Sequence, residues 1–548
     1  MLADRGVGLL VEPLAEAVDS SSERDTPLLR SGGGLTLRDR ASTRRRDAVI
    51  LGAILVVAAA LRLAHLGAPP TDFHATRQYN DVLLAHSFSV DLRHDVPQRE
   101  RDIAAINRPE VLEPPLLEGA TALVDQVIGH ETLVFPRLVS IAAWLLAGLV
   151  LWGIAIRLAT ARVALVAVGV LELLPFAVVA SRSFQPDPLA VTAMLVAVLC
   201  SLRWADRQSA PRLLVAGAAA GVAITIKADF APFVLAAHAA AAWMLPTGGV
   251  RDRLRSVLHP KQALFAIAAV LPALAWTLFG FRTSLSVTGK AGEYFIPGFL
   301  ATSGFWDGIA GQLRGVFGLP VLLAALVGLV LARGRARAVL WSFVMAYVVF
   351  AVAFDYRVAT HSYYQLPAVP FVALASGITV DRVAAWVGGL SVEPILVKAL
   401  AGSCAALATL VVVTQDRLPS TAGGRAEIAK AHALGTALCH PLHSVFVSPA
   451  YGLPLAYHGD IGGTYWPSPS DLRYDALKSR SRRSAVERLA AFRAGGSRYV
   501  IATELDLLTA EPDLPAALSP YPVVVSGPGY RVWDMRSEAP PSCAGGPS

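Results

Sequence analysis

A series of long apolar segments, separated by charge or proline, constrains the fold of this chain more than any other feature. A helix needs about 20 residues to cross the roughly 30 Å hydrocarbon core of a bilayer, and several segments reach that length with their amphipathic ends. Because 54% of the 548 residues are hydrophobic and only 16% are charged, the chain is too apolar for a soluble protein. We therefore expect a polytopic α-helical membrane protein with about eleven spans. The predicted spans are 48–61, 138–156, 162–180, 188–202, 213–226, 230–245, 262–281, 316–332, 338–354, 365–380 and 395–414.

Basic residues gather in every second connection between these segments. Three arginines at 44–46 precede the first span, and further clusters occur near residues 157–162, 203–212, 251–261 and 333–337. This alternation is typical of the positive-inside bias of membrane proteins, and it explains the net charge of +7 without a nucleic-acid partner. It predicts a plasma-membrane protein with a cytoplasmic N-terminus and, for an odd number of spans, an extracytoplasmic C-terminal part.

The domain organisation follows from changes in composition. Residues 1–46 are expected to form a polar cytoplasmic tail rather than a signal peptide, and 47–415 the membrane domain with a long outer loop at 67–132. Residues 416–548 are richer in Pro, Gly and polar residues, which indicates a small extracytoplasmic α/β domain. Its predicted elements are strands at 443–450, 497–503, 521–527 and 530–535 and one amphipathic helix at 475–496.

Chemically active side chains concentrate in the loops on the predicted outer face. Any one of them is more often a paired or snorkelling residue at a helix end, Asp187 is equally an N-terminal helix charge, and Tyr363 and Tyr364 fit an aromatic belt. As a set, carboxylates with Lys, Arg and His facing one compartment indicate a site for an anionic substrate with a general base beside it. The set is Asp72, His74, Arg77, Asp81, Glu113, Arg182, Asp187, Lys227, Asp229, Tyr356, Arg357, His361, Tyr363 and Tyr364.

Several short motifs, in this order along the chain, carry a resemblance to a known family. They are Arg62 in ALRLAHLG, the acidic first loop, EPPL at 113–116, Pro136-Arg137, SRSFQPD at 181–187, the Lys-Ala-Asp turn at 227–229 and HSYYQLPAVP at 361–370. Over residues 47–415 the chain resembles the GT-C class of membrane glycosyltransferases. It is most similar to bacterial relatives of dolichyl-phosphate-mannose protein mannosyltransferases and of the aminoarabinose transferases that modify lipid A.

The resemblance implies transfer of a sugar from a polyprenyl-phosphate carrier to an acceptor at the outer face, where the acceptor is a protein, a lipid or a cell-wall glycan. The family uses a first-loop acid as general base, for which Asp72 is the first choice and Asp81 the second. The polyprenyl tail would lie between spans under the aromatic segment 294–306. The resemblance further implies donor-phosphate binding by Arg77, Arg182, Lys227 and His361, and substrate binding by His74, Glu113, Asp187, Tyr363 and Tyr364.

The first loop departs from the family pattern at one point. Typical members carry an adjacent Asp-Glu pair a short helix turn ahead of a Tyr, whereas this chain reads DFHATRQY at 72–79. The departure leaves open which acid is the base. No Asp-x-Asp, Walker or zinc-ligand motif occurs in the sequence; we therefore predict no cofactor and no metal site, although a divalent cation is not excluded.

Two other classes of protein were weighed against a transferase. A lipid flippase or solute transporter would place ionisable residues within the spans and show related halves, and a membrane scaffold has little use for so many acids and bases in its loops. Cys439 and Cys543 both lie in the predicted outer domain, where they either pair in a disulfide or stay free.

Overall fold

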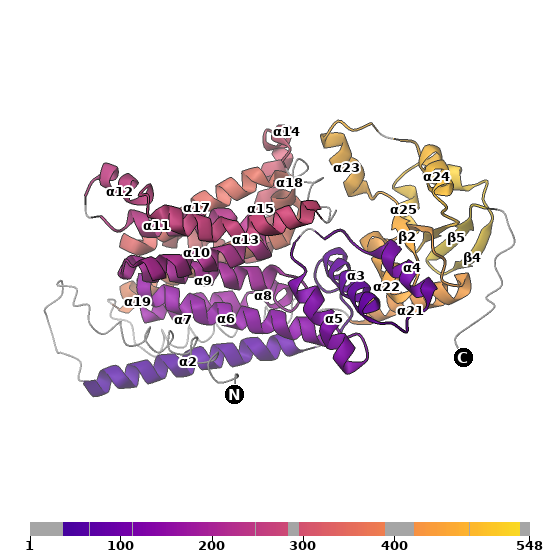
Figure 1. Ribbon diagram of the computed structural model, residues 1–548. Helices are drawn as coiled ribbons and strands as arrows, with labels where there is room; N and C mark the ends of the chain where they lie inside the picture. The colour runs from indigo at the N-terminus through magenta and orange to yellow at the C-terminus, as the bar shows by residue number, and fades with distance from the viewer. Residues whose placement is uncertain are drawn as a thin grey trace.

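The chain forms a long helical bundle with a small α/β domain at one end (Figure 1). This computed structural model describes residues 37–282, 295–388 and 421–536, except for the single positions 65, 112, 247 and 482. The predicted fold class, a helical membrane protein followed by a small α/β domain, is confirmed.

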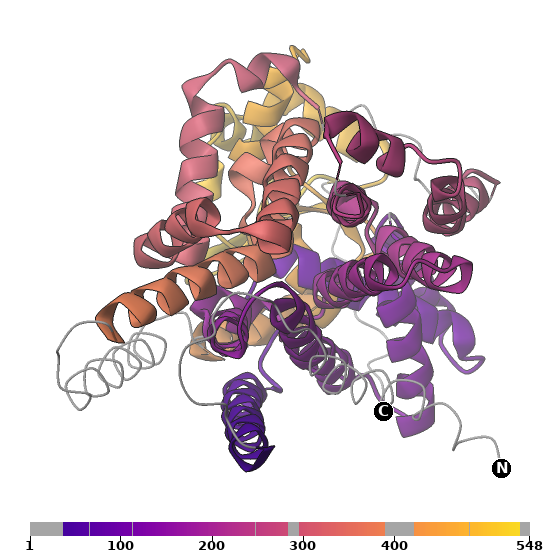
Figure 2. The ribbon, with the colours of Figure 1, turned by 90° about the vertical axis from the view of Figure 1, so that its left-hand side faces the viewer.

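The bundle is built from helices that run roughly parallel and pack through small residues. Gly217 and Gly221 let α10 approach α13 so closely that an added Cβ would lie 2.8 Å from the carbonyl oxygen of Phe265 and 2.5 Å from that of Ala268. Figure 2 looks along the helices and shows the first of them at the edge of the bundle. The bundle helices are α2 (Leu37–Leu63), α6 (Val134–Leu158), α7 (Ala161–Leu173), α8 (Pro175–Ala180), α9 (Asp187–Asp206), α10 (Ala210–Ile226), α11 (Ala231–Trp243), α13 (Gln262–Arg282), α16 (Leu319–Leu331), α17 (Gly334–Ala353) and α19 (Val369–Gly388).

The predicted spans fall on these helices, except that 395–414 lies outside the described residues. Among the described residues, five helices are long and apolar enough to cross a membrane, or six if the bent pair α15–α16 counts as one span. The segment expected as one span at 162–180 is interrupted at Leu174, because the residue before Pro175 is biased away from helical geometry. The predicted number of spans therefore stays a prediction.

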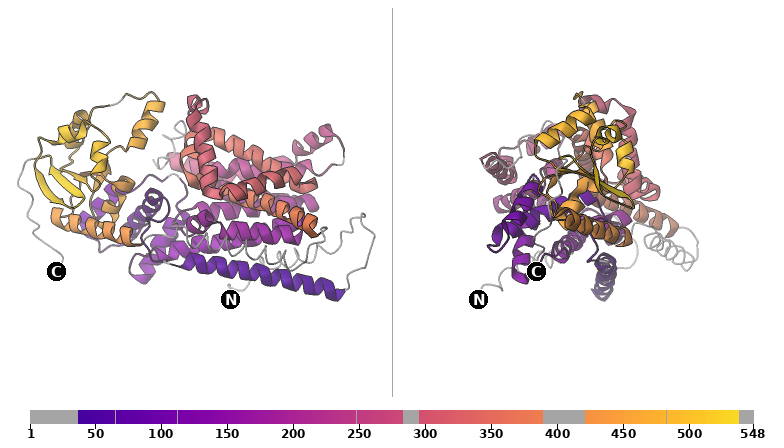
Figure 3. Two further views of the ribbon diagram at one scale, coloured as in Figure 1. Left: turned by 180° about the vertical axis from the view of Figure 1, so that it is seen from behind. Right: turned by 90° about the vertical axis from the view of Figure 1, so that its right-hand side faces the viewer.

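The outer loops predicted to share one face do gather at one end of the bundle, next to the α/β domain (Figure 1). The amphipathic α15 (Ser303–Phe317) lies at this end and is bent by 101° from α16 at Gly318; Figure 3 shows it crossing the bundle direction. The basic helix α12 (Val250–Val257) lies at the opposite end. The other elements at the loop-rich end are α3 (Ala75–Leu92), α4 (Gln98–Asn107), α5 (Leu116–Ile128), η2 (Ala228–Phe230), α14 (Pro297–Leu300), α18 (Asp355–Thr360) and η4 (Ser362–Ala368).

The α/β domain contains a five-stranded sheet in the order β2-β1-β3-β5-β4. Strands β2, β1 and β3 are parallel to one another, and β5 is antiparallel to β3 and β4. Val445, Val500 and Trp533 are buried in the core on one face of the sheet. The elements are α21 (Thr421–Leu438), β1 (Ser444–Val447), η5 (Pro449–Gly452), α22 (Leu453–His458), β2 (Gly463–Tyr465), α23 (Pro469–Leu477), α24 (Ala485–Ala494), β3 (Tyr499–Ala502), α25 (Asp506–Thr509), α26 (Leu514–Leu518), β4 (Val523–Gly527) and β5 (Tyr530–Asp534).

Two expectations for this domain are corrected. The short strand β2 was not predicted, because its three residues are half-buried or exposed and show no apolar pattern. The single helix expected at 475–496 is wrong: α23 ends at Leu477, and α24 begins after Ser484. Ser484 and Glu487 form a capping box that starts the second helix, so its beginning was readable in the sequence. Cys439 takes part in a disulfide, but Cys543 lies outside the described residues, so their pairing stays a prediction.

The first outer loop packs directly against the α/β domain. Tyr79 and Leu83 on α3 face the α/β domain. The Tyr79 hydroxyl lies 3.1 Å from Nε2 of His458, and Leu83 packs into a second hydrophobic cluster of the domain. Asn107, which ends α4, donates to the carbonyl of Ile461 at 2.9 Å and accepts from the amide of Gly463 at 3.1 Å. Helix α3 therefore packs between the bundle and the α/β domain.

A buried ion pair ties the first helix to the bundle. Arg62 lies 3.3 Å from Glu172 of α7, and both side chains are 0% exposed. Arg62 also donates to the Ser181 hydroxyl at 2.6 Å and to the Ala58 carbonyl at 2.9 Å. Gly148 makes room for the pair, since a Cβ there would lie 2.3 Å from Oε1 of Glu172.

We expect Glu172→Ala to destabilise the protein by about 3–5 kcal/mol, because it leaves a buried guanidinium without a counter-ion. The measurement is thermal unfolding of the purified protein in detergent. The double variant Arg62→Met/Glu172→Leu should recover most of the loss, because it removes both charges. An unchanged unfolding midpoint in the single variant would contradict this role.

Candidate active site

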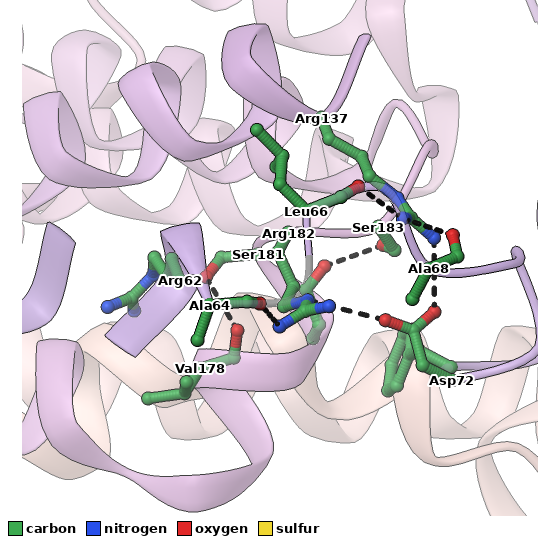
Figure 4. Close-up of polar contacts among 12 residues, drawn as sticks. Arg62, Ala64, Leu66, Ala68, Asp72, Arg137, Val178, Ser181, Arg182 and Ser183 are labelled. Atoms are coloured by element: carbon green, nitrogen blue, oxygen red, sulfur yellow. Dashed lines mark hydrogen bonds and ion pairs between the residues drawn. The ribbon is translucent and has the colours of Figure 1, made fainter. Parts of the chain in front are cut away.

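The predicted site residues separate into two groups, and the first of them anchors the outer loop. Asp72 lies between two arginines, with Oδ2 3.3 Å from Nε of Arg182 and Oδ1 3.6 Å from Arg137 (Figure 4). Gln78 donates to the same carboxylate at 2.9 Å. The side chains of Asp72 and Arg137 are 0% exposed and that of Arg182 is 1% exposed, so the group is closed to solvent.

The two arginines also hold the backbone that leaves the first helix. Arg137 donates to the carbonyls of Leu66 at 2.6 Å and Ala68 at 2.5 Å, and Arg182 donates to that of Ala64 at 2.5 Å. Every contact of this group is internal to the protein. The geometry therefore does not favour the roles predicted for Asp72 as general base and for Arg182 as a phosphate ligand, and both stay predictions.

The second group centres on Lys227, in the turn between α10 and η2. Its Nζ lies 2.6 Å from Asp187 at the start of α9 and 4.0 Å from Glu113. Arg77, on the first turn of α3, lies 3.4 Å from Glu113 and 3.8 Å from Asp187. Four separate segments thus bring two cations and two carboxylates together. Asp187 is 1% exposed whereas Glu113 is 28% exposed, so Glu113 lies at the open side.

Aromatic rings from η4 cover the cations. The guanidinium of Arg77 and the ammonium of Lys227 each lie 5.4 Å from the ring centre of Tyr363, and Lys227 lies 5.8 Å from that of Tyr364. Cations over ring faces are attracted by the negative face of the aromatic system. The two tyrosines therefore help to position Arg77 and Lys227 rather than serving only as membrane anchors.

Further acids lie near the two cations, and burial raises the pKa values of these acids. Burial raises the pKa of Asp229 to about 7 against the opposing charge of Lys227. Burial, and then the neighbouring Glu118, raise the pKa of Asp81, while burial raises that of Glu118 to about 7. Burial lowers the pKa of Lys227, but Asp187, Asp229 and Glu113 outweigh it and the net shift is upward. Lys227 is thus a cation at neutral pH.

Two histidines complete the group. Nε2 of His74 lies 2.8 Å from the hydroxyl of Ser362, and the His74 ring lies 4.9 Å from that of Tyr363 and 6.4 Å from that of His361. Burial lowers the pKa of His74 to about 4, with Asp187 acting in the opposite direction. Burial, with the charge of Arg357, lowers the pKa of His361 to about 3. Both rings are neutral at pH 7, so His361 can offer the predicted phosphate site an N–H group but no charge.

Four residues of these clusters were absent from the predicted set, among them Gln78, which lies within the quoted DFHATRQY segment. Arg137 appeared only as part of a family motif, and Ser362 lies within the quoted HSYYQLPAVP segment. Glu118 carried no signal, because an acid one turn inside an amphipathic helix usually faces solvent. Among the described residues, no group of three His, Cys, Asp or Glu side chains has the arrangement of a metal site.

We expect Asp72→Asn to lower the free energy of unfolding by about 3–5 kcal/mol, because it leaves two buried arginines without their counter-ion. Thermal unfolding in detergent measures the effect. Asp95→Asn, a change to an exposed acid of the same loop, should leave the unfolding midpoint unchanged. If Asp72→Asn keeps wild-type stability and loses only turnover, Asp72 is the base and the anchoring role is wrong.

Comparisons with known proteins show which family and which folds this chain resembles. Residues 112–276 match the family model described as dolichyl-phosphate-mannose-protein mannosyltransferase. The solved structure of ArnT from Cupriavidus metallidurans bound to undecaprenyl phosphate is 15% identical with a TM-score of 0.57, covering 91% of this chain and 99% of that one. The same protein in the apo state gives a TM-score of 0.51 at 16% identity, covering 90% and 98%. The oligosaccharyltransferase of Archaeoglobus fulgidus gives 0.48 at 14% identity, covering 88% and 72%. No curated protein matches the sequence.

The match to the family model covers Glu113, Arg137, Asp187 and Lys227, and the likeness to ArnT covers nearly the whole chain. The loop-by-loop resemblance in the sequence and the fold therefore agree. This chain is a multi-pass membrane protein with the GT-C glycosyltransferase fold, and its residues 112–276 match the model of the dolichyl-phosphate-mannose-protein mannosyltransferase family.

Proposed function

We propose that this protein transfers a sugar from a polyprenyl-phosphate carrier to an acceptor on the side of the membrane that holds the α/β domain. The observation that carries the proposal is that Arg77 and Lys227 both face the ring of Tyr363 and both lie beside the partly exposed Glu113. The donor's phosphodiester becomes a phosphate leaving group, and two cations at this place stabilise the negative charge that develops on it.

The contacts of the two cations support a site made for an anion that is not part of the chain. Glu113 lies 3.4 Å from Arg77 and 4.0 Å from Lys227, longer than the 2.7–2.9 Å of a strong charge-assisted hydrogen bond. Nε of Arg77 is buried and has no hydrogen-bond partner in the described part of the chain. A phosphate group can displace the partly exposed Glu113 and use these donors.

The carrier's apolar tail would leave the site along the outer end of the bundle. α15 and the residues just before α14 present exposed aromatic side chains there: Trp306 is 64% exposed and Phe295 is 44% exposed. Such residues are enriched at the level of the lipid head groups. Of the neighbours, ArnT is described as bound to undecaprenyl phosphate, which is a carrier of the proposed class.

We expect Arg77→Ala and Lys227→Ala each to weaken binding of undecaprenyl phosphate at least tenfold, because each removes one charge from the phosphate site. The measurement is titration of the purified protein in detergent with this lipid, which needs no knowledge of the sugar. Arg335→Ala is the matched control, because Arg335 forms a separate ion pair with Asp206 at 2.7 Å.

Binding that is equal in all four proteins would contradict the phosphate site. Wild-type protein that binds the lipid and, with lipid-linked sugar and an envelope fraction, never releases sugar would instead indicate a lipid flippase or transporter. The same experiment with different donors would identify the sugar, the acceptor and whether the sugar is a hexose or a pentose.

A further inference from the structure

We propose that His74 is the catalytic base, accepting the proton of the acceptor hydroxyl through Nδ1 while its Nε2 is held by Ser362. This inference rests on the proposed function and assigns the base that the first-loop acids were expected to supply.

The backbone of His74 is held in a costly conformation. Its φ of 45° and ψ of 66° are left-handed, which costs a residue with a Cβ roughly 1–2 kcal/mol. Such strain persists only where the surroundings impose it, and it clusters at functional sites. Gln78 fixes this turn by donating to the carbonyl of Phe73 at 2.8 Å and to Asp72 at 2.9 Å. The buried loop anchor thereby determines where the imidazole lies.

The side chain is not used for helix capping, although His74 occupies the N-cap position of α3. Its imidazole reaches another element, η4, where Nε2 lies 2.8 Å from the Ser362 hydroxyl. Nδ1 makes no hydrogen bond to any described residue. If Nε2 donates its hydrogen to Ser362, Nδ1 carries no hydrogen. Its lone pair can then accept a proton, as a general base requires.

The charged groups around His74 suit a base that starts neutral and ends as a cation. Asp187 favours the protonated ring, whereas burial and Arg77 disfavour it, and the neutral rings of His361 and Tyr363 lie beside it. Asp187 can stabilise the imidazolium that forms when the proton arrives, as a carboxylate does beside a catalytic histidine. The ring is unprotonated at neutral pH before the reaction begins.

The neighbouring carboxylates are less suited to this task. Asp72 is enclosed by Arg137 and Arg182, and Asp187 is held by Lys227 at 2.6 Å. Glu113 is accessible, but it contacts both cations and is displaced by the proposed phosphate, so these contacts do not hold it beside the acceptor. Burial raises the pKa of the carboxyl groups of both Asp81 and its neighbour Glu118.

In the proposed step the acceptor oxygen attacks the anomeric carbon as its proton passes to Nδ1 of His74. The bond between the anomeric carbon and the phosphate oxygen breaks, and its electron pair stays on that oxygen beside Arg77 and Lys227. The products are the glycosylated acceptor, the polyprenyl phosphate and an imidazolium, which returns its proton to solvent. No oxidant, reductant or cofactor is required.

The test uses the full-length protein and a donor taken from cells, so that the sugar need not be known. Lipids are extracted from host cells in which this gene is deleted and in which the unused donor accumulates, and release of its sugar to an envelope fraction is followed by mass spectrometry. The proteins are wild type, His74→Gln, His74→Asp, Glu113→Gln and, as a matched control on an exposed histidine of the same loop, His94→Gln.

We expect His74→Gln to lower turnover at least 100-fold, in the range that a general base contributes. Its affinity for undecaprenyl phosphate should change less than threefold, which also shows that the variant is folded. His74→Asp should regain at least tenfold over His74→Gln, because a carboxylate again supplies a base, and His94→Gln should match wild type.

Three outcomes would overturn the inference. His74→Gln turns over at the wild-type rate; or it loses lipid binding in proportion to turnover, which makes His74 a phosphate or structural residue; or Glu113→Gln alone abolishes turnover with binding intact, which makes Glu113 the base. If wild-type protein itself fails to bind undecaprenyl phosphate, the proposed function falls, and the inference falls with it.

Discussion

The buried contact of Asp72 with Arg137 and Arg182 is the interaction on which the rest of the structure depends. The first outer loop is long and polar, and in a membrane protein such a segment has no apolar core of its own to fix it. Arg137 in α6 and Arg182 in the turn after α8 hold its beginning through four backbone carbonyls and the Asp72 carboxylate. Because buried charges are costly unless fully paired, this arrangement allows few alternatives, and it sets the position of His74 and Arg77 a few residues later.

The chemistry of the site follows from an excess of acids around two cations. Lys227 and Arg77 face Asp187 and Glu113, and Asp229 and Asp81 stand behind them with pKa values raised by burial. A site of this composition is close to neutral only while some acids hold protons. Under the proposed function, the donor phosphate replaces Glu113 at the two cations. The same low-dielectric surroundings that raise these pKa values strengthen the attraction between phosphate and cations.

The α/β domain is joined to the site through the same loop. Leu83, Tyr79 and Asn107 of the first loop enter or contact its core, and Tyr474 of α23 packs against Tyr356 of α18, with ring centres 5.0 Å apart. The domain thus touches two of the loops that build the site, and Figure 3 shows it covering that end of the bundle. Under the proposed function, an acceptor would reach the site beside this domain.

The sequence by itself determined the architecture, because the length and spacing of apolar segments reflect the thickness of a bilayer, and the alternation of basic clusters assigns the loops to two sides. It also indicated the loop residues of the candidate site, since charged groups at the ends of spans are costly and seldom kept without partners. Only the tertiary structure decided how they divide: Asp72 and Arg182 become a closed anchor, whereas Arg77, Glu113, Asp187 and Lys227 meet in an accessible cluster. Sequence patterns report periodicity along one chain, but burial and pairing depend on which segments meet across the bundle. The same holds for His74, whose imidazole meets Ser362, Tyr363 and His361 from a distant part of the sequence.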